Sequence, residues 1–382
     1  MKTLGILLGL VFAFSLSTGG QSGRRVVATP TPTPSAAAEK NYSETVPLPK
    51  RPPRISPLFR GVGIDAERSA STTVASDAAP AADDGDDIVT VDTNLVTIPV
   101  SVFDRNGLYI PGLAKENFRV FDNGVEQQIE YFGTSDKPFT VVLLIDTSPS
   151  TNYKIKEIRD AARAFVDQLK PQDRVAVVEF DGDVQILTPP TSNRTEIYRG
   201  IEKADFGSGT ALYDGVFVSL TRVLGDVEGR KAVVLFTDGV DTQSSKSNYD
   251  TTLDLAEEFD ALIFPIYYNT FFETSRGSRL SWPFPGRGPQ PAGTTSAEYA
   301  VGKKYLEELA GYTGGRVFRP EATPGGLMNA FEGIAEELRR QYNIGYVPSE
   351  DGKAGERRQI RVRVDRTNLV VRSRDSYIVG AQ

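Results

Sequence analysis

Oxygen-bearing side chains follow a short apolar run near the middle of the chain, at Asp146, Ser148 and Ser150. The run, residues 141–145, reads Val-Val-Leu-Leu-Ile and predicts a strand buried on both faces. Apolar residues then recur at helical spacing over residues 155–169. The order is therefore a buried strand, an oxygen-rich loop and an amphipathic helix. In open α/β sheets such a loop lies at the carboxyl end of a strand, where ligands bind.

The spacing Asp-x-Ser-x-Ser has a chemical use, because alternate residues of a tight loop can turn toward one point. One carboxylate and two hydroxyls at that point suit a small hard cation. A second interpretation is that Ser148 or Ser150 only caps the helix that follows. The spacing alone does not choose between a cation site and a helix cap.

Two later stretches favour the cation site. Residues 207–210 read Gly-Ser-Gly-Thr before a helical pattern, and residues 232–239 form a second apolar run that ends in Asp-Gly. With these motifs the chain resembles the von Willebrand factor type A (VWA) family over roughly residues 137–341. That family carries a metal-ion-dependent adhesion site built from Asp-x-Ser-x-Ser, a distant Thr and a distant Asp after a strand. The resemblance implies the metal ligands Asp146, Ser148, Ser150, Thr210 and Asp238.

The resemblance also implies how these residues would work. Ser148 and Ser150 would bind Mg²⁺ or Mn²⁺ directly, Thr210 directly or through water, and the two aspartates mostly through water. A partner protein's Asp or Glu carboxylate would complete the coordination. The implied function is metal-dependent protein–protein contact, in adhesion or scaffolding. The alternative is a structural VWA module whose metal only stabilises the loops.

An Asp-dependent hydrolase is a third interpretation, because two close carboxylates can share a proton. The pattern argues against it, since aspartic proteases are β proteins with Gly soon after the Asp. Here Asp146 and Asp238 each end a strand in an α/β alternation. A haloacid-dehalogenase-type phosphatase would need a second Asp where Ser148 stands. We therefore expect a binding protein and not an enzyme.

Composition removes several function classes. The chain has 382 residues, a formal net charge of −7, no cysteine and no histidine. The acidic balance gives no indication of a nucleic-acid surface. Without cysteine and histidine the chain cannot form disulfides, zinc fingers or histidine-dependent triads. A cation site built from oxygen ligands is among the few metal sites that remain.

The first part of the chain predicts export. Residues 1–20 hold an early Lys, an apolar stretch and small residues, as a secretory signal peptide does. The apolar stretch is shorter than a typical membrane-spanning helix. Residues 21–87 are rich in Pro, Ala and Thr and predict a disordered linker. We expect a secreted, periplasmic or cell-surface protein with no transmembrane segment in the mature chain.

Strand and helix patterns predict the remaining organisation. Alternating apolar residues with Asn-Gly turns predict a small antiparallel β module over residues 88–136. Strands and helices alternate over residues 137–341, which predicts a doubly wound, mainly parallel α/β sheet; it includes a strand at 316–319 and could add an antiparallel edge strand at 184–187. A β pattern returns over residues 342–382, which are too few for a separate domain and could pair with the first module. Secreted bacterial VWA-related proteins have a similar arrangement.

The loop after the strand at residues 262–267 is a candidate partner-binding segment. Residues 271–297 carry aromatic and Arg side chains, which are enriched at binding hot spots. The VWA family places this strand beside the one that ends at Asp238, so the loop should emerge on the metal face. The alternatives are a disordered Gly/Pro-rich insertion or aromatic residues that pack back onto the domain. The candidate partner-binding residues are Phe271, Phe272, Arg276, Arg279, Trp282, Phe284 and Arg287.

Overall fold

The fold is seen in a computed structural model. The predicted signal peptide, residues 1–20, lies outside the residues that it describes, and so does most of the predicted linker. None of the helices within the described residues is both long and apolar enough to cross a membrane. The described residues are 41–48, 95–134, 137–149, 155–268, 295–321, 323, 325–350 and 352–380.

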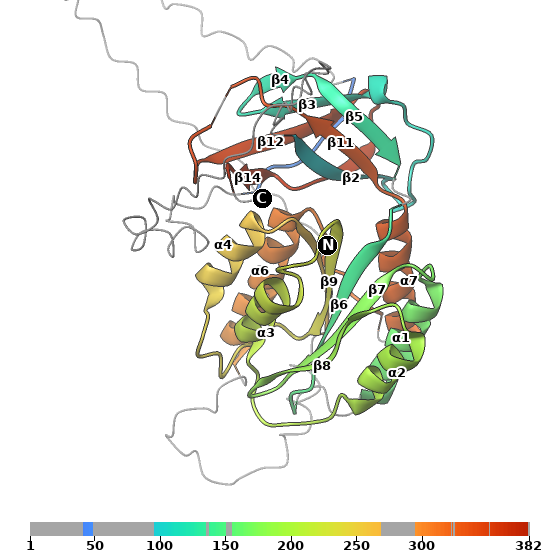
Figure 1. Cartoon of the computed structure of the whole chain (residues 1–382), viewed down its shortest axis with the longest axis vertical. Coiled ribbons are helices and arrows are strands. Elements are labelled where there is room, and N and C mark those ends of the chain that lie inside the picture. Colours follow the sequence, from blue (N-terminus) through green and yellow to red (C-terminus); the bar gives the residue numbers. More distant parts are fainter. Residues whose placement is uncertain are drawn as a thin grey trace, which may run out of the picture. The chain divides into compact units, whose positions relative to one another are not determined.

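A mixed five-stranded sheet forms the centre of the segment that resembles a VWA domain (Figure 1). Its strands, in spatial order, are β10 (Ala261–Tyr267), β9 (Arg230–Thr237), β6 (Phe139–Asp146), β7 (Arg174–Phe180) and β8 (Val184–Thr191). The first four in this order are parallel, and β8 pairs antiparallel with β7. Every residue of β6 is buried, as an unbroken apolar run requires of a central strand.

Helices cover both faces of this sheet. Val141 and Leu143 of β6 belong to one apolar core, and Val142 and Leu144 to the other, because side chains alternate across a strand. The first core includes α1 (Ile155–Gln168), α2 (Arg194–Lys203) and α7 (Gly326–Arg339). The second includes α3 (Leu212–Val218), its π-helical extension η3 (Ser219–Val223), α4 (Tyr249–Glu258) and α6 (Ser296–Thr313). The α/β class is confirmed.

Two antiparallel sheets form a β-sandwich from the residues before and after this α/β unit. One sheet has the order β13 (Leu369–Arg372), β2 (Val96–Asp104), β11 (Tyr342–Tyr346) and β5 (Ile129–Thr134). The other contains β1 (Ser43–Glu44), β12 (Arg357–Val364), β3 (Phe118–Asp122), which follows the short helix η1 (Lys115–Asn117), and β4 (Val125–Gln127), with β14 (Ser376–Ile378) paired to β12. Alternate apolar residues of both sheets, such as Ile98 and Val362, form one core. The two flanks thus share a core, although the division of the chain into domains stays a prediction.

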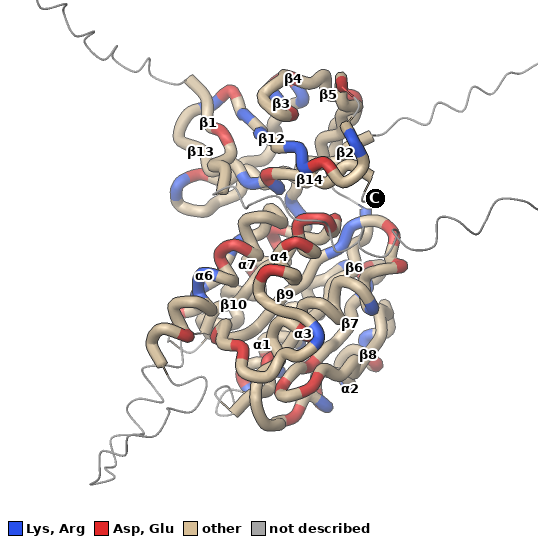
Figure 2. The backbone as a smooth tube through the Cα atoms, turned by 90° about the vertical axis from the view of Figure 1, so that its left-hand side faces the viewer, with Lys and Arg blue, Asp and Glu red and all other residues tan. Residues whose placement is uncertain are grey.

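The prediction of a linker is wrong for residues 41–48, which we term the strap. Ser43 and Glu44 pair with Val364 and Arg363 of β12 (β1 and β12 in Figure 2). Only two residues enter this ladder, and the surrounding sequence is rich in Pro, so no alternating pattern marks the strand.

Buried glutamates join two helices of the α/β unit to strands at the end of the chain. Glu257 of α4 is 3% exposed and pairs with Arg357 of β12 at 2.5 Å. Glu337 of α7 is 1% exposed and pairs with Arg316 at 2.8 Å and with Arg372 of β13 at 4.0 Å. Burial raises the pKa of Glu337, and the two arginines oppose that shift. These contacts are ionic, unlike those inside either apolar core.

A buried charge cluster ties together four strands of the β-sandwich. The carboxylate of Asp122 accepts hydrogen bonds from Arg358 Nε at 2.8 Å, the Tyr346 hydroxyl at 3.1 Å and the Tyr377 hydroxyl at 2.9 Å. The Asp122 and Arg358 side chains are 0% and 3% exposed. Removal of one partner would therefore leave the other charge buried without compensation.

We expect Asp122→Ala to lower the free energy of unfolding by about 3–5 kcal/mol, the range for breaking a buried ion pair. Urea denaturation followed by circular dichroism measures this loss. The matched control is Asp365→Ala, which removes an exposed ion pair with Arg119 and should cost about 0–1 kcal/mol. Equal losses in the two variants would contradict the assignment.

Candidate metal centre

The first candidate ligand, Asp146, is fully buried at the carboxyl end of β6. Its Oδ1 accepts a hydrogen bond from the Ser148 backbone N–H at 3.0 Å, and its Oδ2 accepts one from the Thr237 hydroxyl at 2.7 Å. Thr237 ends β9, and the parallel register that pairs Ile145 with Phe236 brings Thr237 level with Asp146. The sheet itself therefore orients this carboxylate.

The second candidate carboxylate, Asp238, follows β9 directly and is 2% exposed. It accepts hydrogen bonds from the Val240 N–H at 3.1 Å and from the Tyr299 hydroxyl at 3.4 Å. Tyr299 lies on α6, and this helix approaches the Asp238 loop closely. A Cβ atom built on Gly302 of α6 would lie 2.3 Å from the carbonyl oxygen of Gly239. Gly239 has a φ of 84°, which also favours glycine.

Backbone hydrogen bonds hold the hydroxyl-bearing loops at this edge of the sheet. The Thr147 N–H donates to the carbonyl of Phe180 at the end of β7, at 2.9 Å, and the Gly207 N–H donates to the carbonyl of Thr147 at 3.3 Å. The Thr210 N–H donates to Thr242 Oγ1 at 2.9 Å, and its carbonyl accepts from the Thr242 N–H at 2.8 Å. Three loops are thereby linked to one another.

Four of the five predicted ligands are described, and all four are buried: Asp146, Ser148, Thr210 and Asp238. The fifth, Ser150, lies outside the described residues. The candidate partner-binding residues also lie outside them; these are Phe271, Phe272, Arg276, Arg279, Trp282, Phe284 and Arg287.

Electrostatics favour a cation at this centre. Burial, and then the charge of Asp238, raise the pKa of Asp146 to about 7, although hydrogen bonds from Ser148 and Thr237 oppose the shift. A nearby cation would reverse this effect, since an opposite charge favours the ionised carboxylate. Carboxylate and hydroxyl oxygens are also the donors that hard cations prefer. In the described part of the chain no group of three or more Asp, Glu, His or Cys could hold a metal ion, so this donor set depends on its hydroxyls.

Two further aspartates organise the loop after β9. Asp241 accepts a hydrogen bond from the Tyr213 N–H at 3.2 Å. Asp214 accepts from the backbone N–H groups of Ser245 at 2.9 Å and Ser247 at 2.7 Å. Burial works against ionisation of Asp214, but the hydrogen bonds outweigh it and lower its pKa. Both aspartates thus tie the start of α3 to this loop.

Sequence reasoning missed Thr237 and Tyr299, which hold the two carboxylates. The sequence could have indicated Thr237, because an alignment of the two apolar runs as parallel strands places Thr237 beside Asp146. Tyr299 follows Asp238 by 61 positions, and its spacing within a helical pattern predicts only a core residue.

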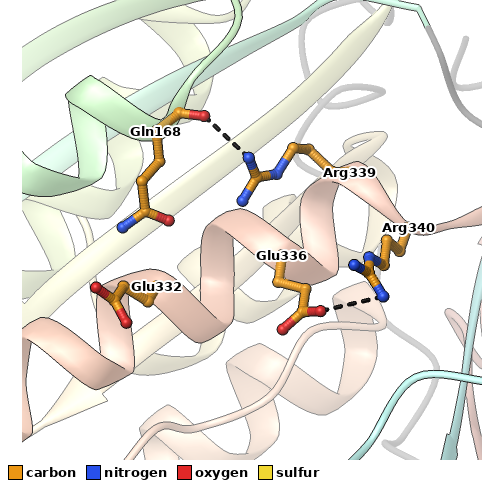
Figure 3. A pocket seen from close by; sticks show the side chains of 5 residues that line it. All are labelled: Gln168, Glu332, Glu336, Arg339 and Arg340. Atoms are coloured by element: carbon orange, nitrogen blue, oxygen red, sulfur yellow. Dashed lines mark hydrogen bonds and ion pairs between the residues drawn. The ribbon is translucent and has the colours of Figure 1, made fainter.

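A surface pocket of about 530 Å³ is drawn in Figure 3, and none of the predicted ligands lines it. The lining residues come from the end of α1, from α7 and from the residue after it: Gln168, Glu332, Glu336, Arg339 and Arg340. Arg339 donates to the Gln168 carbonyl at 3.1 Å, and Arg340 pairs with Glu336 at 3.2 Å. Both arginines thus bind other lining residues, and among the described residues the pocket holds no group of three metal-ligating side chains.

The raised pKa of Asp146 predicts a pH dependence of the metal-free protein. A carboxyl group with a higher pKa in the folded state holds its proton more tightly there, so stability falls as pH rises between the two pKa values. With a chelator present, we expect the free energy of unfolding to fall from the ordinary Asp pKa of 3.8 up to about pH 7. Asp146→Asn should flatten this part of the profile. Urea denaturation across this pH range tests it, and an unchanged slope in the variant would rule out Asp146 as the cause.

Residues 141–240 match the family model described as the von Willebrand factor type A domain. A UPF0353 protein of Mycolicibacterium paratuberculosis is 28% identical over 116 residues, which cover 27% of this chain and 35% of the relative. A second UPF0353 protein of that species is 25% identical over 224 residues, which cover 54% of this chain and 60% of the relative. The chain therefore spans less than two thirds of the length of these relatives.

Two solved structures also resemble this chain. The vWF domain of the type V pili tip protein Mfa5 from Porphyromonas gingivalis has 14% identity and a TM-score of 0.40, with coverage of 53% of this chain and 95% of that one. A von Willebrand factor type A structure from Catenulispora acidiphila has 14% identity and a TM-score of 0.41, with coverage of 76% and 75%. Residues 141–240 are thus similar to von Willebrand factor type A domains.

Proposed function

We propose that the α/β unit is a protein-interaction domain that holds Mg²⁺ or Mn²⁺ and offers it to a carboxylate of a partner protein. The observation that supports this most is the pair of buried aspartates, Asp146 and Asp238, at one edge of the sheet. Burial of two like charges is costly unless a positive charge compensates them.

The residues that would hold the cation are those the sequence pattern predicts. Ser148, Ser150 and Thr210 would present hydroxyl oxygens, and Asp146 and Asp238 would act mostly through water. When bound, the cation supplies a Lewis-acidic position for a partner's carboxylate oxygen. Because the hydroxyl ligands are neutral, they leave most of the positive charge available to that partner. Thr237 and Tyr299 would keep the two carboxylates in place through the hydrogen bonds described above.

We extend the proposal to the setting of this domain. The central sheet is the doubly wound sheet of the family, residues 1–20 are a signal peptide, and the protein acts outside the cytoplasm, in the periplasm or at the cell surface. The export signal in the sequence supports this location.

Two alternatives assign the site a different role. In one, the metal only stabilises the loops. In the other, the aspartates catalyse hydrolysis. Asp146 ends β6 and Asp238 follows β9 in a mainly parallel α/β sheet, whereas the paired aspartates of aspartic proteases lie in β proteins. This setting favours binding over hydrolysis.

We expect Mg²⁺ or Mn²⁺ to bind one site per chain and Asp146→Ala to abolish that binding. Isothermal titration calorimetry measures it, and circular dichroism checks that the variant is folded. The matched control is Asp173→Ala. Asp173 is 1% exposed and accepts from the Phe139 N–H at the opposite end of β6. Equal affinity in wild type and Asp146→Ala would refute the ligand assignment.

A second experiment separates interaction from stabilisation. Tyr267 of β10 is in register with Thr237, so the chain after β10 starts at the same edge of the sheet as Asp238. Replacement of residues 271–294, which end before the N-cap Thr295 of α6, by a short Gly/Ser linker should leave metal affinity unchanged and reduce capture of a partner from source cells. Chelation should abolish that capture without changing the circular dichroism spectrum. Full capture in the presence of chelator would instead support the structural role of the metal.

A further inference from the structure

The strap, residues 41–48, occupies a site built mainly by strand β12, whose paired residues lie more than 300 positions later in the chain. Its two ladder residues, Ser43 and Glu44, pair antiparallel with Val364 and Arg363 at one edge of β12. On the same strand β14 pairs with residues 357–359. The strap therefore covers the part of the β12 edge that β14 leaves open.

Buried polar contacts fix the register of the strap. The Thr45 N–H donates to the carbonyl of Val362 at 2.9 Å, and Thr45 Oγ1 accepts from the Val362 N–H at 3.2 Å. The Ser43 hydroxyl accepts from the Leu369 N–H at 3.0 Å. Ser43 and Thr45 are 8% and 5% exposed. Each hydroxyl thus satisfies a backbone donor of the β-sandwich.

Charge and aromatic contacts hold the outer side of the strap. The guanidinium of Arg363 lies 3.3 Å from the carboxylate of Glu44 and 3.8 Å from the ring centre of Tyr42. The same guanidinium lies 4.8 Å from the ring centre of Phe121, on β3. Arg363 is therefore placed between an aromatic residue of the strap and one of the sandwich.

The last residue of the strap reaches the α/β unit. The Leu48 N–H donates to Asp375 Oδ2 at 3.2 Å. The Leu48 side chain packs on the core that contains α6, against Gly311. A Cβ atom built on Gly311 would lie 2.5 Å from Leu48 Cδ1, so the glycine leaves the space that Leu48 fills. The site is thus specific for an extended segment with Ser, Glu and Thr in succession and an apolar residue three positions later.

Only residues 49–94 connect the strap to the rest of the described chain, and the ladder contains two residues. A ladder of two residues opens at a lower free-energy cost than a long one. Every copy of the chain carries both the strap and its site. A strap from another copy would therefore make all the same contacts, which makes exchange of this element a low-cost route to a dimer.

We propose that this site binds the strap of a second copy of the chain, so that two copies exchange straps and form a symmetric dimer. Main-chain pairing at a sheet edge supplies the affinity, and the contacts of Arg363, Asp375 and Gly311 supply the specificity. The chain's own strap competes at an effective concentration that falls with the length of the connecting segment, residues 49–94. Exchange therefore grows with protein concentration and is favoured where copies are crowded.

Single cysteines test the exchange directly, because the chain has none of its own. Full-length Glu44→Cys is mixed with full-length Arg363→Cys and oxidised with diamide at several protein concentrations. These positions pair across β1 and β12, and each variant alone lacks a partner thiol within its own chain. We expect a disulfide-linked heterodimer, identified by intact mass, whose yield increases with concentration.

The matched control replaces Arg363→Cys by Arg119→Cys. Arg119 is in register with Arg363 on the neighbouring strand β3, one strand farther from the strap, and is more exposed. If straps exchange between copies, the mixture that contains Arg119→Cys should give several-fold less disulfide-linked heterodimer than the mixture that contains Arg363→Cys. In dilute solution the double variant Glu44→Cys/Arg363→Cys should form a disulfide within one chain. That disulfide would verify the register of β1 against β12. The proposal fails if the double variant does not close, or if it closes while the mixture gives no more heterodimer than the control.

Discussion

The parallel register of β6 and β9 is the constraint on which the candidate metal centre depends. It brings the buried Asp146 level with Thr237, and it places Asp238 one residue farther along the same edge. Burial, and then the charge of Asp238, raise the pKa of Asp146. The surrounding loops offset this cost with backbone and hydroxyl donors, and these donors also fix the direction of each carboxylate. The hydrogen bonds that offset the cost of burying the two carboxylates therefore also hold both carboxylates in a fixed orientation.

Local sequence patterns predicted the elements that have a strong burial signal. The apolar run at 141–145 lies within β6, and the antiparallel edge strand at 184–187 lies within β8. The prediction of a strand at 316–319 is wrong, because Phe318 alone pairs there, in an isolated β-bridge with Ile266. A bulky apolar residue flanked by arginines resembles a strand in sequence. Here its ring packs beneath the Arg316 guanidinium. The sequence pattern did not predict helix α2, because only three of its ten residues are buried and its apolar stripe is narrow.

Contacts between distant segments could not be predicted from the sequence. The strap makes its contacts with β12, across almost the whole sequence, and two residues cannot show a period. The link from Tyr299 to Asp238 depends on the packing of Gly302 against Gly239. The sequence contains both glycines, but it does not show that they meet.

Helix α6 fixes the distance between the Asp238 loop and the strap. Near its start Tyr299 contacts the Asp238 carboxylate, and near its end Gly311 contacts Leu48 of the strap. An α-helix rises about 1.5 Å per residue, so these two points are about 18 Å apart along its axis. The helix is clamped at one end by a glycine-to-glycine contact and is too stiff to change that length. Any molecule that touches both the candidate metal centre and the strap must therefore match this fixed spacing.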